Sequence, residues 1–128
     1  MFRTLIVEDS FLFRRLLKET LQSRFPSMEI LEAANGREAL QKIDSFNVDL
    51  VFMDIELHGE NGLELTKRIK AQYPQLITII LTSHDLQEYR EAAFQNGADY
   101  FLSKGSSTRA EILALVDSIL SDRQFDNP

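Results

Sequence analysis

Five short apolar runs alternate along the chain with segments of helical periodicity, and this alternation limits the possible folds more than any other feature of the sequence. The runs lie at residues 4–7, 28–31, 48–53, 76–81 and 100–102. Each run is apolar or β-branched and is bounded by polar or turn residues, which predicts a strand. Because the runs are nearly continuous in hydrophobicity, they indicate strands that are covered on both faces.

The segments between the runs carry the start and stop signals of helices. The first follows Asp9-Ser10, stops at Pro26 and places these apolar side chains on one predicted stripe: Leu12, Leu16, Leu17, Leu21 and Phe25. Asn35-Gly36 opens a second helix, which runs through Ile43. The boundary signals of the other three helices are Gly62 and Pro74, Asp85 (with Glu88 as capping partner) and Asn96-Gly97, and Thr108 with Glu111 in a capping box.

Five βα units with right-handed crossovers wind helices onto both faces of a parallel sheet. The chain of 128 residues is long enough for one domain with a single core. We find no internal repeat, low-complexity tract or linker within it. The sequence therefore predicts an α/β fold with a single doubly wound five-stranded parallel sheet.

Composition excludes several classes of function. The absence of cysteine excludes disulfides, cysteine-ligated zinc, iron–sulfur clusters and thiol catalysis. A formal net charge of −6 opposes phosphate backbones and anionic lipid headgroups, so we expect no direct binding of nucleic acid or membrane. The chain has no cationic, signal-like start and no apolar segment near the ~20 residues that span a bilayer, so we expect it to be cytoplasmic.

Polar residues follow four of the five predicted strands at their carboxyl ends. Glu8 and Asp9 follow the first strand, Asp54 the third, Thr82 the fourth and Lys104 the fifth. In doubly wound sheets the ligand binds beyond this edge. The three carboxylates can converge there on one hard cation, with Asp54 left available as a nucleophile. This arrangement suggests phosphoryl chemistry on an aspartate.

The chain resembles the receiver domain of two-component response regulators over essentially its whole length. The resemblance lies in an ordered set of motifs: Leu5-Ile6-Val7-Glu8-Asp9, Asp54, Leu81-Thr82-Ser83 and Gly97-Ala98-Asp99-Tyr100-Phe101-Leu102-Ser103-Lys104. It implies a flavodoxin-like sheet of order 2-1-3-4-5, for which the chemotaxis receiver is a reference example. It also implies that Asp54 accepts a phosphoryl group from a histidine kinase or a phosphotransfer protein and thereby controls a downstream output, with transcription through a separate domain as one form.

A magnesium ion (or Mn²⁺) fits this set of acids, because Mg²⁺ prefers oxygen ligands and retains several waters. We expect Asp9 and Asp54 to bind the metal, Glu8 to contribute through water, and the backbone carbonyl near Glu56 to complete the protein ligands. Without the cation, three clustered acids would repel one another and raise at least one pKa.

The remaining site residues have roles that follow from phosphoryl transfer, which depends mainly on positioning and on charge neutralisation. Lys104 would contact one phosphoryl oxygen and Thr82 would donate its hydroxyl to another. In the family, an aromatic side chain at the position of Tyr100 then turns inward as part of the switch. Glu56 and His84, two residues beyond Asp54 and Thr82, are expected to tune the rate of dephosphorylation.

Each of these residues alone also has an ordinary structural explanation. Asp9 is a typical helix N-cap, Lys104 a typical surface lysine, and Thr82 and Tyr100 typical strand residues. It is the ordered set that favours the functional interpretation.

The sequence departs from the family pattern at two positions. His58 stands where many receivers have proline, so the loop after Asp54 loses a fixed φ and is expected to be more mobile. We expect His58 to be an exposed loop residue, with tuning of the site by its near-neutral titration as the alternative. Gly105 stands where proline often follows the lysine, which leaves the conformation of the Lys104–Gly105 bond open.

The last predicted helix has a wide apolar arc: Ile112, Leu113, Leu115, Val116, Ile119 and Leu120. Core packing explains an arc of this kind, but receivers also commonly form homodimers through their fourth helix, fifth strand and fifth helix. We expect the domain to comprise residues 1–121, and residues 122–128 to form a polar tail or the start of a linker to an output domain.

Other functional classes remain as alternatives. A phosphate-independent pseudo-receiver is one, although such proteins usually lose the acceptor or an acid. A phosphohydrolase with an aspartyl-phosphate intermediate is less favoured, since Asp54-Ile55-Glu56 lacks the Asp-x-Asp motif of haloacid-dehalogenase-like enzymes. A flavodoxin would need a first loop rich in Ser, Thr and Gly, where this chain has Glu8-Asp9-Ser10-Phe11. We therefore expect a phosphoacceptor signalling domain and not an enzyme.

Overall fold

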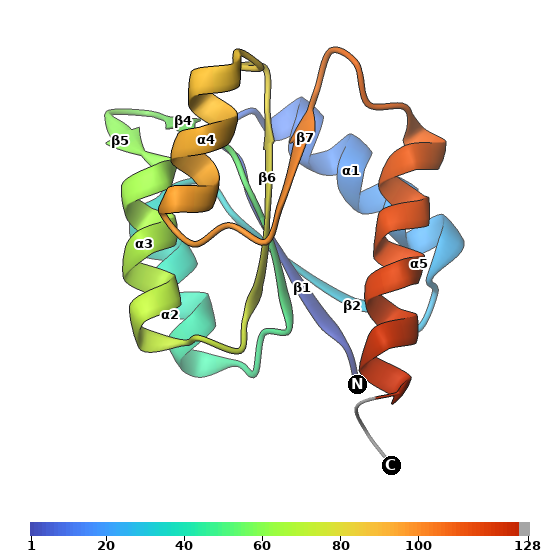
Figure 1. The fold of residues 1–128 in the computed structure, drawn as a ribbon. Helices are drawn as coiled ribbons and strands as arrows, with labels where there is room; N and C mark the ends of the chain where they lie inside the picture. The colour runs from blue at the N-terminus through green and yellow to red at the C-terminus, as the bar shows by residue number, and fades with distance from the viewer. Residues whose placement is uncertain (126–128) are drawn as a thin grey trace.

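The computed structural model describes residues 1–125, and its centre is a five-stranded parallel sheet (Figure 1). Its strands are β1 (Arg3–Val7), β2 (Glu29–Ala33), β3 (Leu50–Met53), β6 (Ile77–Thr82) and β7 (Tyr100–Ser103). They lie in the order β2-β1-β3-β6-β7, and every neighbouring pair is parallel. Counted along these strands alone, the order is 2-1-3-4-5, so the predicted fold class is confirmed.

Helices cover both faces of the sheet. One face carries α1 (Phe11–Arg24) and α5 (Arg109–Phe125), and the other carries α2 (Gly36–Ser45), α3 (Gly62–Gln72) and α4 (Gln87–Gln95), as Figure 1 shows. Successive residues of a strand point to opposite faces. Val51 and Met53 therefore belong to the core beneath α2, α3 and α4, whereas Leu50 and Phe52 belong to the core beneath α1 and α5. Burial on both faces agrees with the continuous apolar runs of the sequence.

Most of the predicted helix ends are confirmed. Ser10 and Asn35 precede α1 and α2 as expected, and each accepts a backbone N–H from the first turn with its side-chain oxygen. The third helix begins at Gly62, and Asn61, which the sequence did not single out, caps it in the same way. Thr108 and Glu111 form the predicted capping box of α5: the Glu111 N–H donates to the Thr108 hydroxyl (3.1 Å), and the Thr108 N–H donates to the Glu111 carboxylate (3.3 Å).

The predicted cap of α4 is wrong. Leu86 is the residue that precedes this helix, and no side chain caps it. Asp85 instead accepts a hydrogen bond from the Ser103 hydroxyl of β7 (3.3 Å). The Asp85 carboxylate therefore bonds a residue distant in sequence and does not cap the helix that follows it. At the other end, Gly97 has φ +98° and ends α4 as predicted.

The predicted apolar stripe of α1 is partly wrong. Leu17, Leu21 and Phe25 are buried, but Leu12 and Leu16 have 69% and 52% of their surface exposed. The inward row instead begins at Phe13, which is half-buried and packs with Leu17 and Leu21 against the sheet. Residues four apart lie on one face of a helix, so Phe13, Leu17, Leu21 and Phe25 form a continuous row.

Two features lie outside the predicted elements. β4 (Glu56–Leu57) and β5 (Glu60–Asn61) form a short antiparallel hairpin where the sequence indicated a mobile loop, and Gly59 has φ +70° at its turn. Residues 122–125 of the expected polar tail continue α5, and residues 126–128 lie outside the described part of the chain. None of the helices in the described part is both long enough and apolar enough to cross a membrane.

The apolar arc of α5 mostly faces the core. Val116 and Ile119 are fully buried, and the other four members of the arc are half-buried against the same cluster: Ile112, Leu113, Leu115 and Leu120. Core packing therefore involves every residue of the arc.

Candidate functional site

The carboxyl ends of the parallel strands bring the predicted acids together. Glu8 and Asp9 follow β1 and Asp54 follows β3, and one carboxylate oxygen from each lies within 4.8 Å of the others. The acids line an open cleft of about 800 Å³, together with Lys104 after β7 and Ser83 after β6. Acids from two strands thus form one site because parallel strands end at the same edge.

Lys104 is held between two of these carboxylates. Its ammonium donates to Asp54 Oδ2 (3.0 Å) and to Glu8 Oε1. On another side the ammonium lies 4.1 Å from the centre of the Phe13 ring. Burial alone would lower the pKa of Lys104, but the hydrogen bonds to Glu8 and Asp54 raise it above its ordinary value. The lysine is therefore a charged member of the site.

Glu8 and Asp9 have different surroundings. Glu8 is 3% exposed, and besides Lys104 it accepts the Ser10 N–H (3.1 Å). Burial raises the pKa of Glu8 in spite of these bonds. Asp9 faces solvent more and accepts both the ring Nδ1 (2.8 Å) and the backbone N–H (3.1 Å) of His58, which together lower its pKa. Because Ser10 caps α1, Asp9 is free of the capping role that it would otherwise be expected to fill.

Asp54 is placed by a tight connection between β3 and α3. Its backbone N–H donates to Val7 of β1 (3.1 Å), which joins the two acidic strand ends. Gly62 bonds the Ile55 carbonyl through its N–H (2.6 Å), and a Cβ at Gly62 would overlap the Asp54 carbonyl oxygen. Only glycine allows this close approach, so the hairpin returns directly over Asp54.

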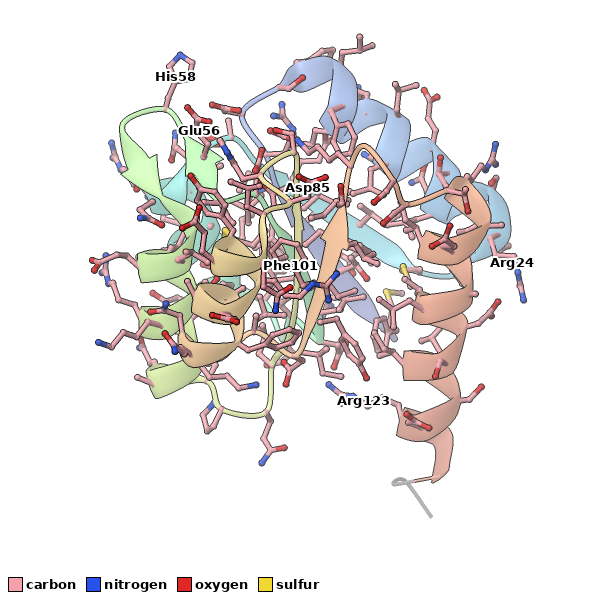
Figure 2. All side chains as sticks on the ribbon, turned by 45° about the horizontal axis from the view of Figure 1, so that its top comes forward. Arg24, Glu56, His58, Asp85, Phe101 and Arg123 are labelled. Carbon is pink, nitrogen blue, oxygen red and sulfur yellow. The ribbon has the colours of Figure 1, made fainter. Side chains whose placement is uncertain are left out.

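Glu56 and His84 meet on one side of the cleft. The Glu56 carboxylate is 2.6 Å from His84 Nε2, and its side chain is 76% exposed. The Glu56 N–H points at Asp54 Oδ1 over a long contact of 3.4 Å. In Figure 2, Glu56 lies over the carboxyl ends of the strands and His58 at the tip of the hairpin. This pair links the ends of β3 and β6.

Thr82 and Tyr100 lie outside the lining of the cleft. Thr82 is fully buried at the end of β6, and its hydroxyl accepts the His84 N–H (3.3 Å). Tyr100 begins β7, three residues before the carboxyl end of that strand, and is half-buried on the α5 side. The residues of the predicted switch therefore sit behind the cleft and not in it.

The Lys104–Gly105 bond is trans, as are all peptide bonds of the described residues. The Lys104 N–H donates to the Thr82 carbonyl (2.8 Å), and the Gly105 N–H donates to the Ser103 hydroxyl (3.2 Å). These bonds fix the turn after β7 without proline.

Sequence reasoning missed the contacts made by His58 and Phe13. The bond of His58 to Asp9 joins residues that are 49 positions apart, and it depends on a hairpin that has no apolar pattern. Phe13 had an available signal, since it starts the row of apolar residues spaced by four along α1.

The donor set suits Mg²⁺. Three carboxylates converge, and hard oxygen ligands are those that Mg²⁺ prefers. Glu8, Asp9 and Asp54 are the described side chains that would hold the ion, and the cleft leaves room for its water ligands.

Comparison with known proteins identifies the family. The model of the response regulator receiver domain matches residues 4–117. A protein-glutamate methylesterase/protein-glutamine glutaminase of Pseudoalteromonas atlantica is 36% identical over 124 residues, which are 91% of this chain and 32% of that protein. The chain spans between 29% and 56% of the lengths of eight curated relatives, which include transcriptional regulators as well as methylesterases.

Solved structures agree with this match. The CheY-like receiver domain protein of Methanospirillum hungatei superposes with a TM-score of 0.88 at 25% identity, over 99% of both chains. The response regulator protein TrrA of Thermotoga maritima, solved in complex with Mg²⁺ and BeF, gives a TM-score of 0.81 at 38% identity, over 92% of this chain and 98% of that one. Receiver domains are signalling domains that generally use Mg²⁺ at their acidic phosphorylation site. This chain belongs to the receiver domain family of two-component response regulators.

Proposed function

We propose that the chain accepts a phosphoryl group on Asp54. The observation that carries this proposal is the hydrogen bond from the Lys104 ammonium to Asp54 Oδ2 (3.0 Å) inside the cluster of three carboxylates. Of the three acids, Glu8 is bonded to Lys104 and to a backbone N–H, and Asp9 is bonded twice to His58. Asp54 is the acid that combines a bond to Lys104 with an oxygen, Oδ1, whose only partner in the described part of the chain is the distant Glu56 N–H, whereas Asp9 has no bond to the lysine there.

The reaction joins Asp54 to phosphorus and releases the donor. An Asp54 oxygen forms the new P–O bond while the P–N bond of a phosphohistidine breaks, and the donor imidazole leaves. The Lys104 ammonium would then donate a hydrogen bond to a negatively charged phosphoryl oxygen. Asp9 and Asp54 would hold Mg²⁺, with Glu8 and the Glu56 carbonyl in support, and the ion would supply positive charge beside the phosphoryl oxygens.

The switch would begin with a movement of Thr82 and Lys104 toward the phosphoryl group. The Thr82 oxygen accepts the His84 N–H, and this bond leaves the hydroxyl proton for donation to the phosphoryl group. In receivers an aromatic side chain then turns inward, and Tyr100, half-buried on the α5 side of β7, is the residue expected to do so here. A local charge change would thus bias a packed element between two positions.

The partners follow from this chemistry. A histidine kinase or a phosphotransfer protein would supply the phosphoryl group. The face of α4, β7 and α5 would form a homodimer once Asp54 is modified, and an output domain beyond residue 121 would receive the signal. We propose no turnover of an external substrate beyond autophosphorylation and autodephosphorylation by the domain itself.

Incubation with acetyl phosphate and Mg²⁺ tests the acceptor. We expect the wild type to shift on a phosphate-affinity gel and Asp54→Ala to stay unshifted, while Asp122→Ala, which removes an exposed acid of α5, behaves as the wild type. A shift in both the wild type and Asp54→Ala would overturn the assignment. No shift in either would favour a phosphate-independent module, and steady turnover of phosphate monoesters would favour a phosphohydrolase.

A further inference from the structure

Phe13 places its aromatic ring against the ammonium of Lys104. Its ring centre lies 4.1 Å from the Lys104 ammonium. The backbone of Phe13 is fixed by the Ser10 hydroxyl, which accepts the Phe13 N–H (3.3 Å) and thereby caps α1. The position of the ring is therefore set by Ser10, which directly follows the acids Glu8 and Asp9.

The lysine needs such support. Its ammonium ends a flexible four-carbon side chain and carries three hydrogens in a tetrahedral arrangement. Asp54 and Glu8 each accept one of them. The ring of Phe13 presents its negative face to the remaining side of the ammonium, at a distance typical of a cation–π contact.

The contact comes from behind the cleft. Glu8, Asp54 and Lys104 line the cleft, whereas Phe13 packs with Leu17 in the core beneath α1 and α5. The Lys104 side chain is 18% exposed, so the ammonium is partly withdrawn from water and the attraction of the ring is less screened than at a surface.

We propose that Phe13 is a positioning residue that holds the Lys104 ammonium in the phosphoacceptor site through a cation–π contact. The kinetic part of this inference rests on the proposed function of Asp54. The ring limits the lysine to the side of the site where the phosphoryl oxygens arrive. It would continue to attract the ammonium after the lysine has exchanged a carboxylate for a phosphoryl oxygen.

Two substitutions separate this role from packing. Phe13→Leu keeps an apolar side chain of similar reach and removes the π face, whereas Phe13→Tyr keeps the ring. Phe25→Leu is the matched control, because Phe25 directly follows α1, is buried in the same core, and its ring lies 5.1 Å from the Arg24 guanidinium. Figure 2 shows Arg24 at the far end of α1 from the cleft.

The first measurement is the initial rate of phosphorylation by acetyl phosphate at saturating Mg²⁺. We expect Phe13→Leu to be about three- to tenfold slower than the wild type, as expected for loss of one partly desolvated cation–π contact. Phe13→Tyr and Phe25→Leu should remain within about twofold of the wild type, a change smaller than that of one such contact. A wild-type rate for Phe13→Leu, or an equal loss in Phe25→Leu, would overturn the proposal.

The second measurement is the NMR shift of the ε-methylene protons of Lys104, which a facing aromatic ring moves upfield. We expect this upfield shift in the wild type and in Phe13→Tyr, and its loss in Phe13→Leu. An ordinary ε-methylene shift in the wild type would refute the contact. If the wild type takes up no phosphoryl group, the proposed function fails, and the NMR result still decides whether the ring holds the lysine.

Discussion

Lys104→Met tests how much of the stability of the fold depends on one cation. The substitution keeps the length of the side chain and removes the ammonium. Glu8 and Asp54 are only 3% and 8% exposed, and both bond the Lys104 ammonium in the wild type. In the variant the two carboxylates have no cation between them. Removing one partner from a buried ion pair leaves an uncompensated charge, which typically costs about 3–5 kcal/mol.

The geometry gives a similar magnitude. Like charges separated by the 4.8 Å that bounds the carboxylate cluster repel by about 3 kcal/mol at an effective dielectric constant of about 20. Because the cleft is open to water, we expect the lower end of the range, a loss of about 3 kcal/mol in the free energy of unfolding. Mg²⁺ replaces the missing charge, so it should stabilise Lys104→Met more than the wild type.

The assay is urea unfolding with and without Mg²⁺. We expect Lys104→Met to unfold at a lower urea midpoint in a chelating buffer, with a slope close to that of the wild type, and the difference to shrink in Mg²⁺. Equal stability of the two proteins in the chelating buffer would refute the reasoning, because it would mean that the two carboxylates do not depend on the lysine.

The same variant has a distinctive pH dependence. Burial raises the pKa of Glu8 above its ordinary value of 4.5, so the folded state binds more protons than the unfolded state, and this contribution to stability declines as the pH rises above 4.5. Lys104 opposes this rise in pKa, so its removal enlarges the effect. The deficit of Lys104→Met in the free energy of unfolding should therefore narrow from about pH 8 to about pH 5. A deficit that widens on acidification would contradict this assignment.

Three further changes probe the surroundings of the site. Gly62→Ala places a Cβ against a backbone carbonyl and should cost about 1–3 kcal/mol in urea unfolding, whereas Gly105→Ala, whose Cβ meets only a hydroxyl at 3.8 Å, should be nearly neutral. Glu56→Ala breaks the pair with His84 and opens one side of the cleft to water, so loss of the phosphoryl label should accelerate about two- to fivefold; unchanged decay would exclude a role for the pair. His58→Ala removes the ring that lowers the pKa of its carboxylate partner, so the loss of Mg²⁺ binding on acidification, followed by calorimetry, should move to higher pH.

The sheet could be predicted because its strands are buried on both faces. The apolar runs near Val7, Met53 and Leu81 appear in the structure as central strands, with boundaries displaced by one or two residues. The order of the strands came from the family resemblance and not from the apolar pattern.

The orientation of α1 could not be predicted from spacing alone. Leu12 and Leu16 are four residues apart, as are Phe13 and Leu17, so the sequence offers two apolar rows on one helix. The longer row packs against the sheet because it buries more surface, and that choice depends on tertiary contacts. The first residue of that row is the one that meets Lys104.

The acidic cluster could be predicted from the ends of the strands, but its hydrogen bonds could not. Parallel strands fix where Asp9 and Asp54 emerge, while the bond of Asp9 to His58 depends on the hairpin of β4 and β5. Strands of two residues carry too little hydrophobic pattern to be detected in a sequence. The carboxylate that a lysine or histidine contacts depends on how segments distant in sequence pack together.

The most direct test of the central claim is to locate the phosphoryl group. The protein is treated with acetyl phosphate and Mg²⁺, the acyl phosphate is reduced with borohydride, and the peptides are analysed by mass spectrometry. Reduction converts a phosphorylated aspartate into homoserine, so we expect homoserine at position 54 and intact carboxylates at Glu8, Asp9 and Glu56. A reduced residue at any of those three positions, with Asp54 unchanged, would contradict this assignment.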